Sequence, residues 1–243
     1  LGGMAAVHDR QMIKYIDEFR DPALARSLLA RIEARSTRPV RLMEFCGGHT
    51  HAILRYGLRS LLPETVDLRS GPGCPVCVTA NADLDRAIAL AGVPGLILTT
   101  FGDMIRVPGS RQSLQEAKAS GSDVRIVYST LDALRIARNN PARPVVFLGV
   151  GFETTAPTVA AAILQAEREG LVNFSVLSLH KLTPPATRAI LDAGEVALHG
   201  IIGPGHVTTI IGSDAWGFLP SRYGVPVAIA GFEPVGILHA VAD

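Results

Sequence analysis

All three cysteines of the sequence lie in two short loops, and two histidines share the first loop. Cys46 is followed by His49 and His51, with Gly47 and Gly48 directly behind the thiol. Glycines let the backbone turn sharply and approach a ligand closely. A thiolate and an imidazole at this spacing suit a metal with open coordination positions, or a catalytic thiol activated by a base. The alternative is a packed cysteine with helix-capping histidines, which would not require two glycines.

The second loop carries a dithiol, Cys74 and Cys77, after a second predicted strand. Two cysteines separated by two residues can close a small disulfide ring, and a following helix N-terminus would lower the pKa of the thiols. We therefore expect redox or sulfur chemistry here. The alternative is half of a zinc site, but that site needs four ligands and the chain contains no second cysteine pair.

Polar residues at the ends of other predicted strands give weaker signals. The run at 149–155 is a glycine-rich turn into a helix that could cradle an anion, although it lacks the GxGxxG and Walker spacings. Any single polar residue at such a position could simply form part of a turn or cap a helix. Their shared position at strand ends makes them candidate ligand contacts: Thr50, Asp103, Glu153, Thr154, His206 and Glu233.

Composition excludes several classes of protein. The 243 residues include 23 Lys and Arg against 22 Asp and Glu, without a basic stripe, so a nucleic-acid partner is not expected. No apolar run reaches the roughly 18 residues of a membrane span. The sequence shows no export signal at its start, and an odd number of cysteines fits reduced thiols. These features predict a cytoplasmic protein.

Strand and helix patterns alternate along the chain after an N-terminal helical arm at 1–38. We predict an α/β fold of two similar halves, at 39–141 and 142–243, divided at the polar break 139–144. Alternation of this kind gives right-handed βαβ units and parallel sheets. Each half would have a mostly parallel sheet of about four strands flanked by helices, and the loops would face a shared cleft. The predicted strands are 41–46, 66–70, 95–101, 124–128, 145–150, 174–179, 200–203 and 226–231.

The two predicted halves also repeat their loop motifs. The Cys46 loop after the first strand corresponds to 151–155 after the fifth, and 101–104 corresponds to 203–206. Helices are expected to begin at Asp21-Pro22, at Thr79, near Ser110 and at Ser129 in the first half, by capping patterns. In the second half they are expected at Thr155, at Thr183, after Gly205 and after Pro234.

Together these motifs resemble the HypD family of [NiFe]-hydrogenase maturation factors. The resemblance covers nearly all of 40–240. It is carried, in order, by CGGHTHAI, YGLRSLLP, GPGCPVCV, FGDMIRVPGS, VRIVYSTLDAL, VVFLGVGFETTAPTVA, NFSVLSLHKLTPPA, GPGHVTTIIG and AGFEPVGIL.

The resemblance implies an assembly scaffold rather than a metabolic enzyme. On this scaffold an iron with two cyanides and one carbon monoxide, Fe(CN)2CO, would be built together with the partner HypC, and HypE with HypF would deliver cyanide. Cys46 would be the iron ligand with His49 beside it, and Cys74 and Cys77 would form the redox dithiol. Low-spin iron with these diatomic ligands is soft and suits thiolates. Two other classes remain open: a free-standing thiol–disulfide oxidoreductase, and a nucleotide-dependent transferase using the turn at 149–155.

The sequence departs from the family pattern in two places. Family members continue into a cysteine-rich segment that holds a [4Fe–4S] cluster, which needs four thiolates. The three cysteines present here cannot bind it. Gly236 stands where the family leads us to expect an acidic residue.

Overall fold

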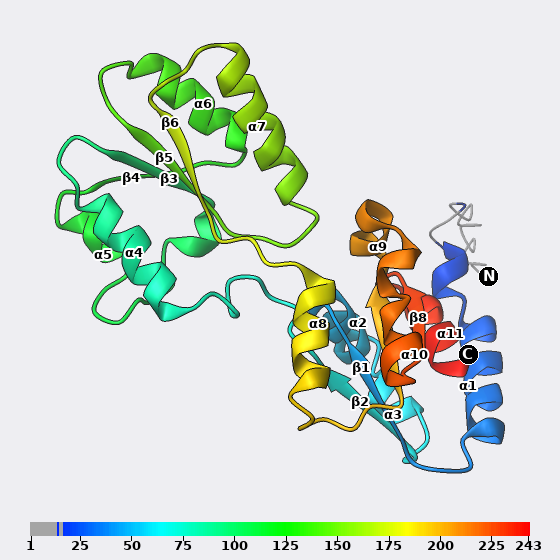
Figure 1. The fold of residues 1–243 in the computed structure, drawn as a ribbon. Helices are drawn as coiled ribbons and strands as arrows, with labels where there is room; N and C mark the ends of the chain where they lie inside the picture. Colours follow the sequence, from blue (N-terminus) through cyan, green and yellow to red (C-terminus); the bar gives the residue numbers. More distant parts are fainter. Residues whose placement is uncertain (1–13, 15–16) are drawn as a thin grey trace, which may run out of the picture. The chain divides into compact units, whose positions relative to one another are not determined.

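Two four-stranded parallel sheets organise the chain, as the computed structural model shows for residue 14 and residues 17–243 (Figure 1). The chain divides into two compact units. Unit 1 comprises residues up to 71, together with 197–205 and 218–243, and unit 2 comprises 72–196 and 206–217. The predicted α/β class with two similar halves is confirmed.

Unit 1 contains the sheet with the order β2-β1-β7-β8. Its register places Val40 opposite Val66, Leu42 opposite Gly200, and Ile201 opposite Val227. The strands are β1 (Val40–Glu44), β2 (Val66–Ser70), β7 (Gly200–Pro204) and β8 (Val227–Ala230). The helices are η1 (Asp17–Arg20), α1 (Pro22–Arg35), α2 (Gly47–Arg55), α3 (Leu58–Leu61), α10 (Phe218–Tyr223) and α11 (Pro234–Ala242).

Unit 2 contains the sheet with the order β4-β3-β5-β6. Its strands are β3 (Ile97–Thr100), β4 (Asp123–Ile126), β5 (Val145–Gly149) and β6 (Phe174–Ser178). In Figure 1 the helices α4 and α5 cover one face of this sheet, and α6 and α7 cover the other. The helical elements are α4 (Asn81–Ala91), η2 (Gly102–Met104), α5 (Leu114–Ala119), α6 (Thr130–Asn139), α7 (Ala156–Arg168), α8 (Thr183–Asp192), α9 (Gly205–Ile211) and η3 (Ser213–Trp216).

Both sheets have the same topology. Numbered by their order within each unit, the strands run 2-1-3-4, so the first and third strands are neighbours at the centre. The strand order reverses between these two strands, and open α/β sheets bind ligands at the carboxyl ends of the strands at such a point. In unit 1 this point lies between the ends of β1 and β7, and in unit 2 between the ends of β3 and β5.

The division into units differs from the predicted boundary between residues 141 and 142. The polar segment at 139–144 leads from α6 into β5, and both elements belong to unit 2. The side-chain amide of Asn173 holds this segment in place. It donates to three backbone carbonyls at 3.0–3.1 Å, those of Ala137, Asn140 and Arg143. Proline and asparagine therefore mark a tight connection inside one unit. The sheet order also changes the predicted loop pairs: the Cys46 loop corresponds to the loop after β3, and residues 151–155 correspond to the loop after β7.

Capping side chains explain the starts of four helices, α1, α2, α5 and α6. Asp21 accepts hydrogen bonds from Ala23 N and Leu24 N at the start of α1, as expected. The predicted capping box at Ser129 and Asp132 is present at the start of α6. Two expected starts are displaced, because α4 begins at Asn81 and not at Thr79, and α5 begins after the capping box of Ser113 and Glu116.

The predicted N-terminal arm is part of unit 1. Helix α1 lies beside α11 (Figure 1), and its Leu28 and Ile32 join one buried cluster with Ile237 and Leu238. The buried face of α1 therefore packs on α11 at the end of the described chain. The part of the arm at residues 1–13 and 15–16 lies outside the described residues. Among the helices that the structure describes, none combines the length and apolarity that crossing a bilayer requires.

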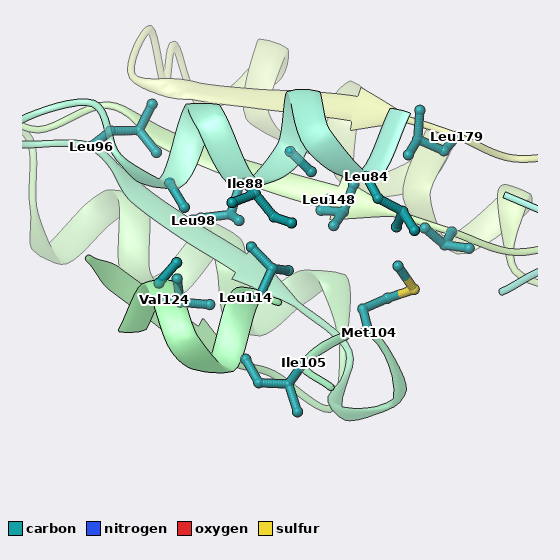
Figure 2. Packing of buried hydrophobic residues seen from close by; sticks show 14 residues of the cluster. Leu84, Ile88, Leu96, Leu98, Met104, Ile105, Leu114, Val124, Leu148 and Leu179 are labelled. Carbon is teal, nitrogen blue, oxygen red and sulfur yellow. The ribbon is translucent and has the colours of Figure 1, made fainter. Parts of the chain in front are cut away.

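The largest core of unit 2 lies between α4, α5 and the sheet. Figure 2 shows its side chains converging from these elements, with Leu98 of β3 and Leu148 of β5 facing Ile88 of α4 and Leu114 of α5. Leu98 and Leu148 are fully buried. Strand β3 also buries Thr99 and Thr100, whose hydroxyls donate to the carbonyls of Val146 and Leu148 in β5.

Leu148→Ala is expected to destabilise the protein by about 2–5 kcal/mol, because it removes a fully buried side chain and leaves a cavity. Leu164→Ala is the matched control, since Leu164 is 51% exposed on α7, and it should change the stability by less than about 0.5 kcal/mol. Urea unfolding followed by circular dichroism measures both. Equal effects would mean that Leu148 does not lie in a close-packed core.

Candidate functional site

Cys46 occupies the N-cap of α2, directly after β1. Its backbone is extended (φ −165°, ψ 137°), and its sulfur accepts a hydrogen bond from Gly48 N at 3.4 Å. The short side chain of an N-cap residue satisfies an amide that the helix itself leaves unpaired. The thiol is half-buried. The predicted strand-to-helix turn is therefore present, with the sulfur held at the carboxyl end of a central strand.

Glu44 stabilises this turn through hydrogen bonds, a role that was not predicted from the sequence. Its side chain is 1% exposed, and one carboxylate oxygen accepts from Cys46 N at 3.0 Å. The other oxygen accepts from the Thr50 hydroxyl, which also donates to Ser70 Oγ at 3.3 Å. The carboxylate thus joins the end of β1 to the first turns of α2. An acidic residue at the end of an apolar strand, two positions before the cysteine, was the available signal.

His49 lies one turn into α2 and is completely buried. Its Nε2 lies 3.1 Å from the carbonyl oxygens of both Ala230 and Gly231, in the connection from β8 to α11. The Phe232 ring meets the imidazole edge-on, with centroids 5.1 Å apart and planes at 69°. His49 therefore connects the cysteine turn to the loop that follows β8.

Burial controls the protonation of both groups. It raises the pKa of the Cys46 thiol, an effect that the Gly48 N–H opposes and the charge of Glu44 reinforces. Burial likewise lowers the pKa of the His49 imidazole below its usual value, against the hydrogen bonds to Ala230 and Gly231. Both effects favour the neutral forms. The thiol at the start of α2 is consequently protonated over a wider pH range than a free cysteine.

Glu233 is held by a residue that precedes α1. Both carboxylate oxygens accept from the Arg20 guanidinium at 2.8 Å, and this contact lowers the pKa of the Glu233 carboxyl. Because Glu233 is the N-cap of α11 and follows Phe232 directly, the ion pair fixes the loop that contacts His49. Glu233 was predicted as a contact residue from the sequence, whereas its partner Arg20, 213 positions away, was not.

The dithiol loop lies in unit 2. Residues 75–78 form turns, with the Cys77 amide donating to the Cys74 sulfur at 3.3 Å. Cys77 is exposed, Cys74 is half-buried, and both are free thiols. The prediction that a helix N-terminus lowers the pKa is wrong for Cys77: a hydrogen bond to Cys74 raises the pKa of the Cys77 thiol, and α4 begins only at Asn81.

A second buried carboxylate, Glu153, follows β5 in unit 2. It is 4% exposed and accepts from Thr183 N at 2.5 Å and from Thr183 Oγ1 at 2.7 Å. It thereby fixes the start of α8 against the loop after β5. Glu153 thus links two loops from a buried position. In the segment between β6 and α8, the Nδ1 atom of His180 shares a hydrogen bond of 2.9 Å with Ser178 Oγ.

Four other predicted residues are exposed: His51 on α2, Thr154 before α7, Asp103 on η2 and His206 on α9. Gly47 is exposed, whereas Gly48 has the Phe232 ring against it: an added Cβ would lie 2.7 Å from the ring. Within residue 14 and residues 17–243, no cluster of three or more His, Cys, Asp or Glu side chains is arranged to hold a metal ion.

The fold and these sites define an α/β protein with a single thiol at one strand end and a dithiol in a separate loop. The family model HypD, described as "Hydrogenase formation hypA family", matches residues 23–243. The chain belongs to the HypD family. The predicted resemblance is confirmed.

Several relatives align along nearly the whole chain. It is 57% identical to "Hydrogenase maturation factor HypD" of Azotobacter vinelandii over 237 residues, which are 94% of this chain and 62% of that protein. Proteins of the same printed name are 52% identical in Rhodobacter capsulatus and 44% identical in Escherichia coli (strain K12), each over 94% of this chain and 63% of the relative. The chain thus spans somewhat less than two thirds of the length of these relatives.

Glu44→Gln is expected to lower the pKa of the Cys46 thiol, because it removes a negative charge that disfavours the thiolate. Only the thiolate reacts with iodoacetamide, so the rate of labelling at Cys46 should rise at lower pH than in the unsubstituted chain. Mass spectrometry of the Cys46 peptide over a pH series measures this. Asp67→Asn, on an exposed position of β2, should leave the profile unchanged. An unaltered profile in Glu44→Gln would contradict the electrostatic argument.

Proposed function

We propose that this chain acts in hydrogenase maturation as the scaffold on which Fe(CN)2CO is assembled, with Cys46 as its thiolate ligand to the iron. Membership in the HypD family supports the general role, since the relatives are named as hydrogenase maturation factors. The observation that carries the proposal is the position of Cys46. A single half-buried sulfur stands at the point where the strand order of the unit 1 sheet reverses, and the described part of the chain does not close a set of metal ligands around it.

A site with an incomplete set of protein ligands suits an iron centre that binds only transiently. Iron with strong-field diatomic ligands is soft, prefers thiolates and needs vacant positions for incoming cyanide and carbon monoxide. One cysteine from this chain leaves those positions open. A second thiolate from HypC would complete the binding site, and HypE with HypF would supply cyanide. The competent species is then the complex with HypC.

The dithiol loop is the redox-active part of the scaffold in this proposal. Cys74 and Cys77 would be the pair that interconverts between dithiol and disulfide. The [4Fe–4S] cluster implied for full-length family members needs four thiolates. The three cysteines here belong to the two loops described above, so the residues present do not fit that cluster.

Cys46→Ala is expected to abolish the infrared bands of iron-bound cyanide and carbon monoxide in the complex with a HypC-type partner, because the iron loses its ligand from this chain. His239→Ala, an exposed substitution on α11, is the control and should retain the bands. Circular dichroism of each variant checks the fold. Bands of full intensity in Cys46→Ala would remove Cys46 from the proposed role.

Oxidation is expected to protect Cys74 and Cys77 from maleimide while Cys46 remains labelled, because two cysteines separated by two residues in one loop can close a disulfide. Labelling before and after reduction, read by mass spectrometry of the cysteine peptides, measures this. In Cys77→Ser the labelling of Cys74 should no longer depend on oxidation. Identical labelling of the pair in oxidised and reduced samples would contradict the redox role.

A second candidate function, a free-standing thiol–disulfide oxidoreductase, is favoured by one observation. A largely apolar pocket of unit 2 adjoins the dithiol loop, lined by Pro72 and Val78 on the loop side and by Leu182 and Pro185 from α8 and the residue before it. Such a pocket suits an apolar side chain of a protein substrate. Turnover of a model disulfide by the isolated chain, lost in Cys74→Ser but not in Cys46→Ala, would support this candidate over the scaffold.

A further inference from the structure

Strand β6 is an edge strand of the unit 2 sheet, and within the described part of the chain it pairs with β5 alone. Two hydrogen bonds show which of its backbone groups face β5. The carbonyl of Asn173 accepts from β5 at one end, and Leu179 N donates to the residue that ends β5 at the other. Successive residues of a strand direct their N–H and C=O groups to opposite sides, so the odd-numbered residues between these two also face β5. The N–H and C=O groups of Phe174 and Val176 therefore point away from the sheet.

Charged side chains do not protect this edge. Edge strands commonly carry charges, which disfavour pairing with a further strand. The opposite edge strand of the same sheet, β4, follows this rule, because Arg125 and Asp123 form an ion pair along it at 2.8 Å. The sequence of β6, FSVLS, contains no charged residue. An open and uncharged edge of this kind can accept an additional strand.

A pocket of about 490 Å³ lies alongside this edge, between β6 and α7, which run beside each other in Figure 1. Its apolar lining comes from Phe174 and Val176 of the strand, Ile163 and Ala166 of the helix, and Leu171 between them. The two strand side chains are half-buried, and Ile163 is 47% exposed. Peptides that add a strand to the edge of a sheet place alternate side chains in pockets of this kind.

The connection from α7 to β6 fixes the shape of the pocket. Gly170 adopts φ +64°, a left-handed conformation that favours glycine, and its N–H donates to the Glu167 carbonyl at 3.0 Å. Leu171 N donates to the Ala166 carbonyl at 2.9 Å, which completes a Schellman motif. Leu171 and Ala166 also pack in the same apolar cluster. The pocket is thus built into the end of the helix, and a ligand need not create it.

One charged side chain, Glu167, lines the pocket. It is exposed, and its carboxylate forms no ion pair within the described part of the chain. Its neighbour Glu169 differs in this respect, because it binds the Arg138 guanidinium at 2.7 Å. An unpaired carboxylate beside an apolar pocket favours a partner with a cationic side chain and disfavours one with an anionic side chain.

We propose that β6 and α7 form a docking site for an extended segment of a partner protein, which adds a fifth strand to the unit 2 sheet. Alternate apolar side chains of the segment enter the pocket, and a lysine or arginine lies against Glu167. The open backbone groups of Phe174 and Val176 call for an extended chain, because a helix uses its own N–H and C=O groups internally. This surface involves neither Cys46 nor the dithiol loop, so the inference goes beyond the proposed scaffold function.

Strand addition is tested with a synthetic peptide in which valine, lysine and valine alternate with threonines. The peptide is added to the full chain labelled with ¹⁵N, and hydrogen exchange is followed by nuclear magnetic resonance. Exchange at the amides of Phe174 and Val176 should slow, whereas the amides of Ser175 and Leu177 are already protected by β5. The same peptide, methylated on the amide nitrogens that would face β6, keeps its side chains and should give no protection. Unchanged exchange at Phe174 and Val176 with the unmethylated peptide would overturn the proposal.

The charge of the partner segment is tested by replacing the peptide lysine with glutamate. This change should weaken binding by about two- to five-fold, the range expected for an exposed ion pair. Glu167→Lys should reverse the preference between the two peptides. Glu64→Lys, the same change at an exposed position between α3 and β2, should preserve it. Fluorescence anisotropy of labelled peptides measures the affinities. Equal affinity of the unsubstituted chain for both peptides would overturn the choice of a basic segment.

A second copy of the chain is the alternative occupant, through pairing of β6 with its counterpart. Sedimentation of the chain without peptide should show a monomer. Ile163→Lys should weaken binding of the lysine peptide, because it removes apolar surface and adds a positive charge at the pocket. Its fold is checked by circular dichroism. A dimer of the unsubstituted chain that dissociates in Ile163→Lys would assign the edge to self-association and overturn the partner assignment.

Discussion

The Cys46 site depends on the buried carboxylate of Glu44. This side chain binds the amide of Cys46 and the hydroxyl of Thr50, so that strand β1 ends and helix α2 begins within two residues. A carboxylate with so little access to water must have its lone pairs satisfied, and both oxygens are. The position of the sulfur, the start of α2 and the location of His49 all follow from this constraint.

The two units show how one topology carries different chemistry. Both sheets run 2-1-3-4, and in both the loops at the point of strand reversal contain the sequence motifs that stood out: the Cys46 loop in unit 1 and the Gly151–Thr155 loop in unit 2. Each unit also has a buried glutamate at a strand end, Glu44 or Glu153. One supports a thiol, and the other ties two loops together. The fold therefore supplies the location of a site, and the side chains decide its chemistry.

Local signals in the sequence predicted much of this structure. Helix starts at Asp21 and Ser129 were evident because capping depends on residues only two or three positions apart. The location of Cys46 at a strand end followed from an apolar run and two glycines. The division into units could not be predicted in the same way, because it depends on which strands pair. The pairing of β1 with β7 joins residues about 160 positions apart and leaves no local mark.

The interactions that complete the site were missed for the same reason. The ion pair between Arg20 and Glu233 and the contact of His49 with the loop after β8 each join distant parts of the chain. The dithiol loop shows the opposite failure. There a local argument, the proximity of a helix N-terminus, was applied to cysteines that precede the helix by several residues, and the hydrogen bond between the two thiols determines the pKa of Cys77 instead.

The order of the strands along the chain has a consequence for biosynthesis. The sheet of unit 2 uses one continuous stretch, from β3 to β6, so all of its strands have been synthesised before β7 is made. Domains generally fold as units while synthesis proceeds from the N-terminus. Strands β1 and β2 cannot complete their sheet until β7 and β8 have been synthesised. His49 likewise cannot form its hydrogen bond to the Ala230 carbonyl before then. The nascent chain consequently carries an unfinished cysteine turn until nearly all of the described sequence has been translated.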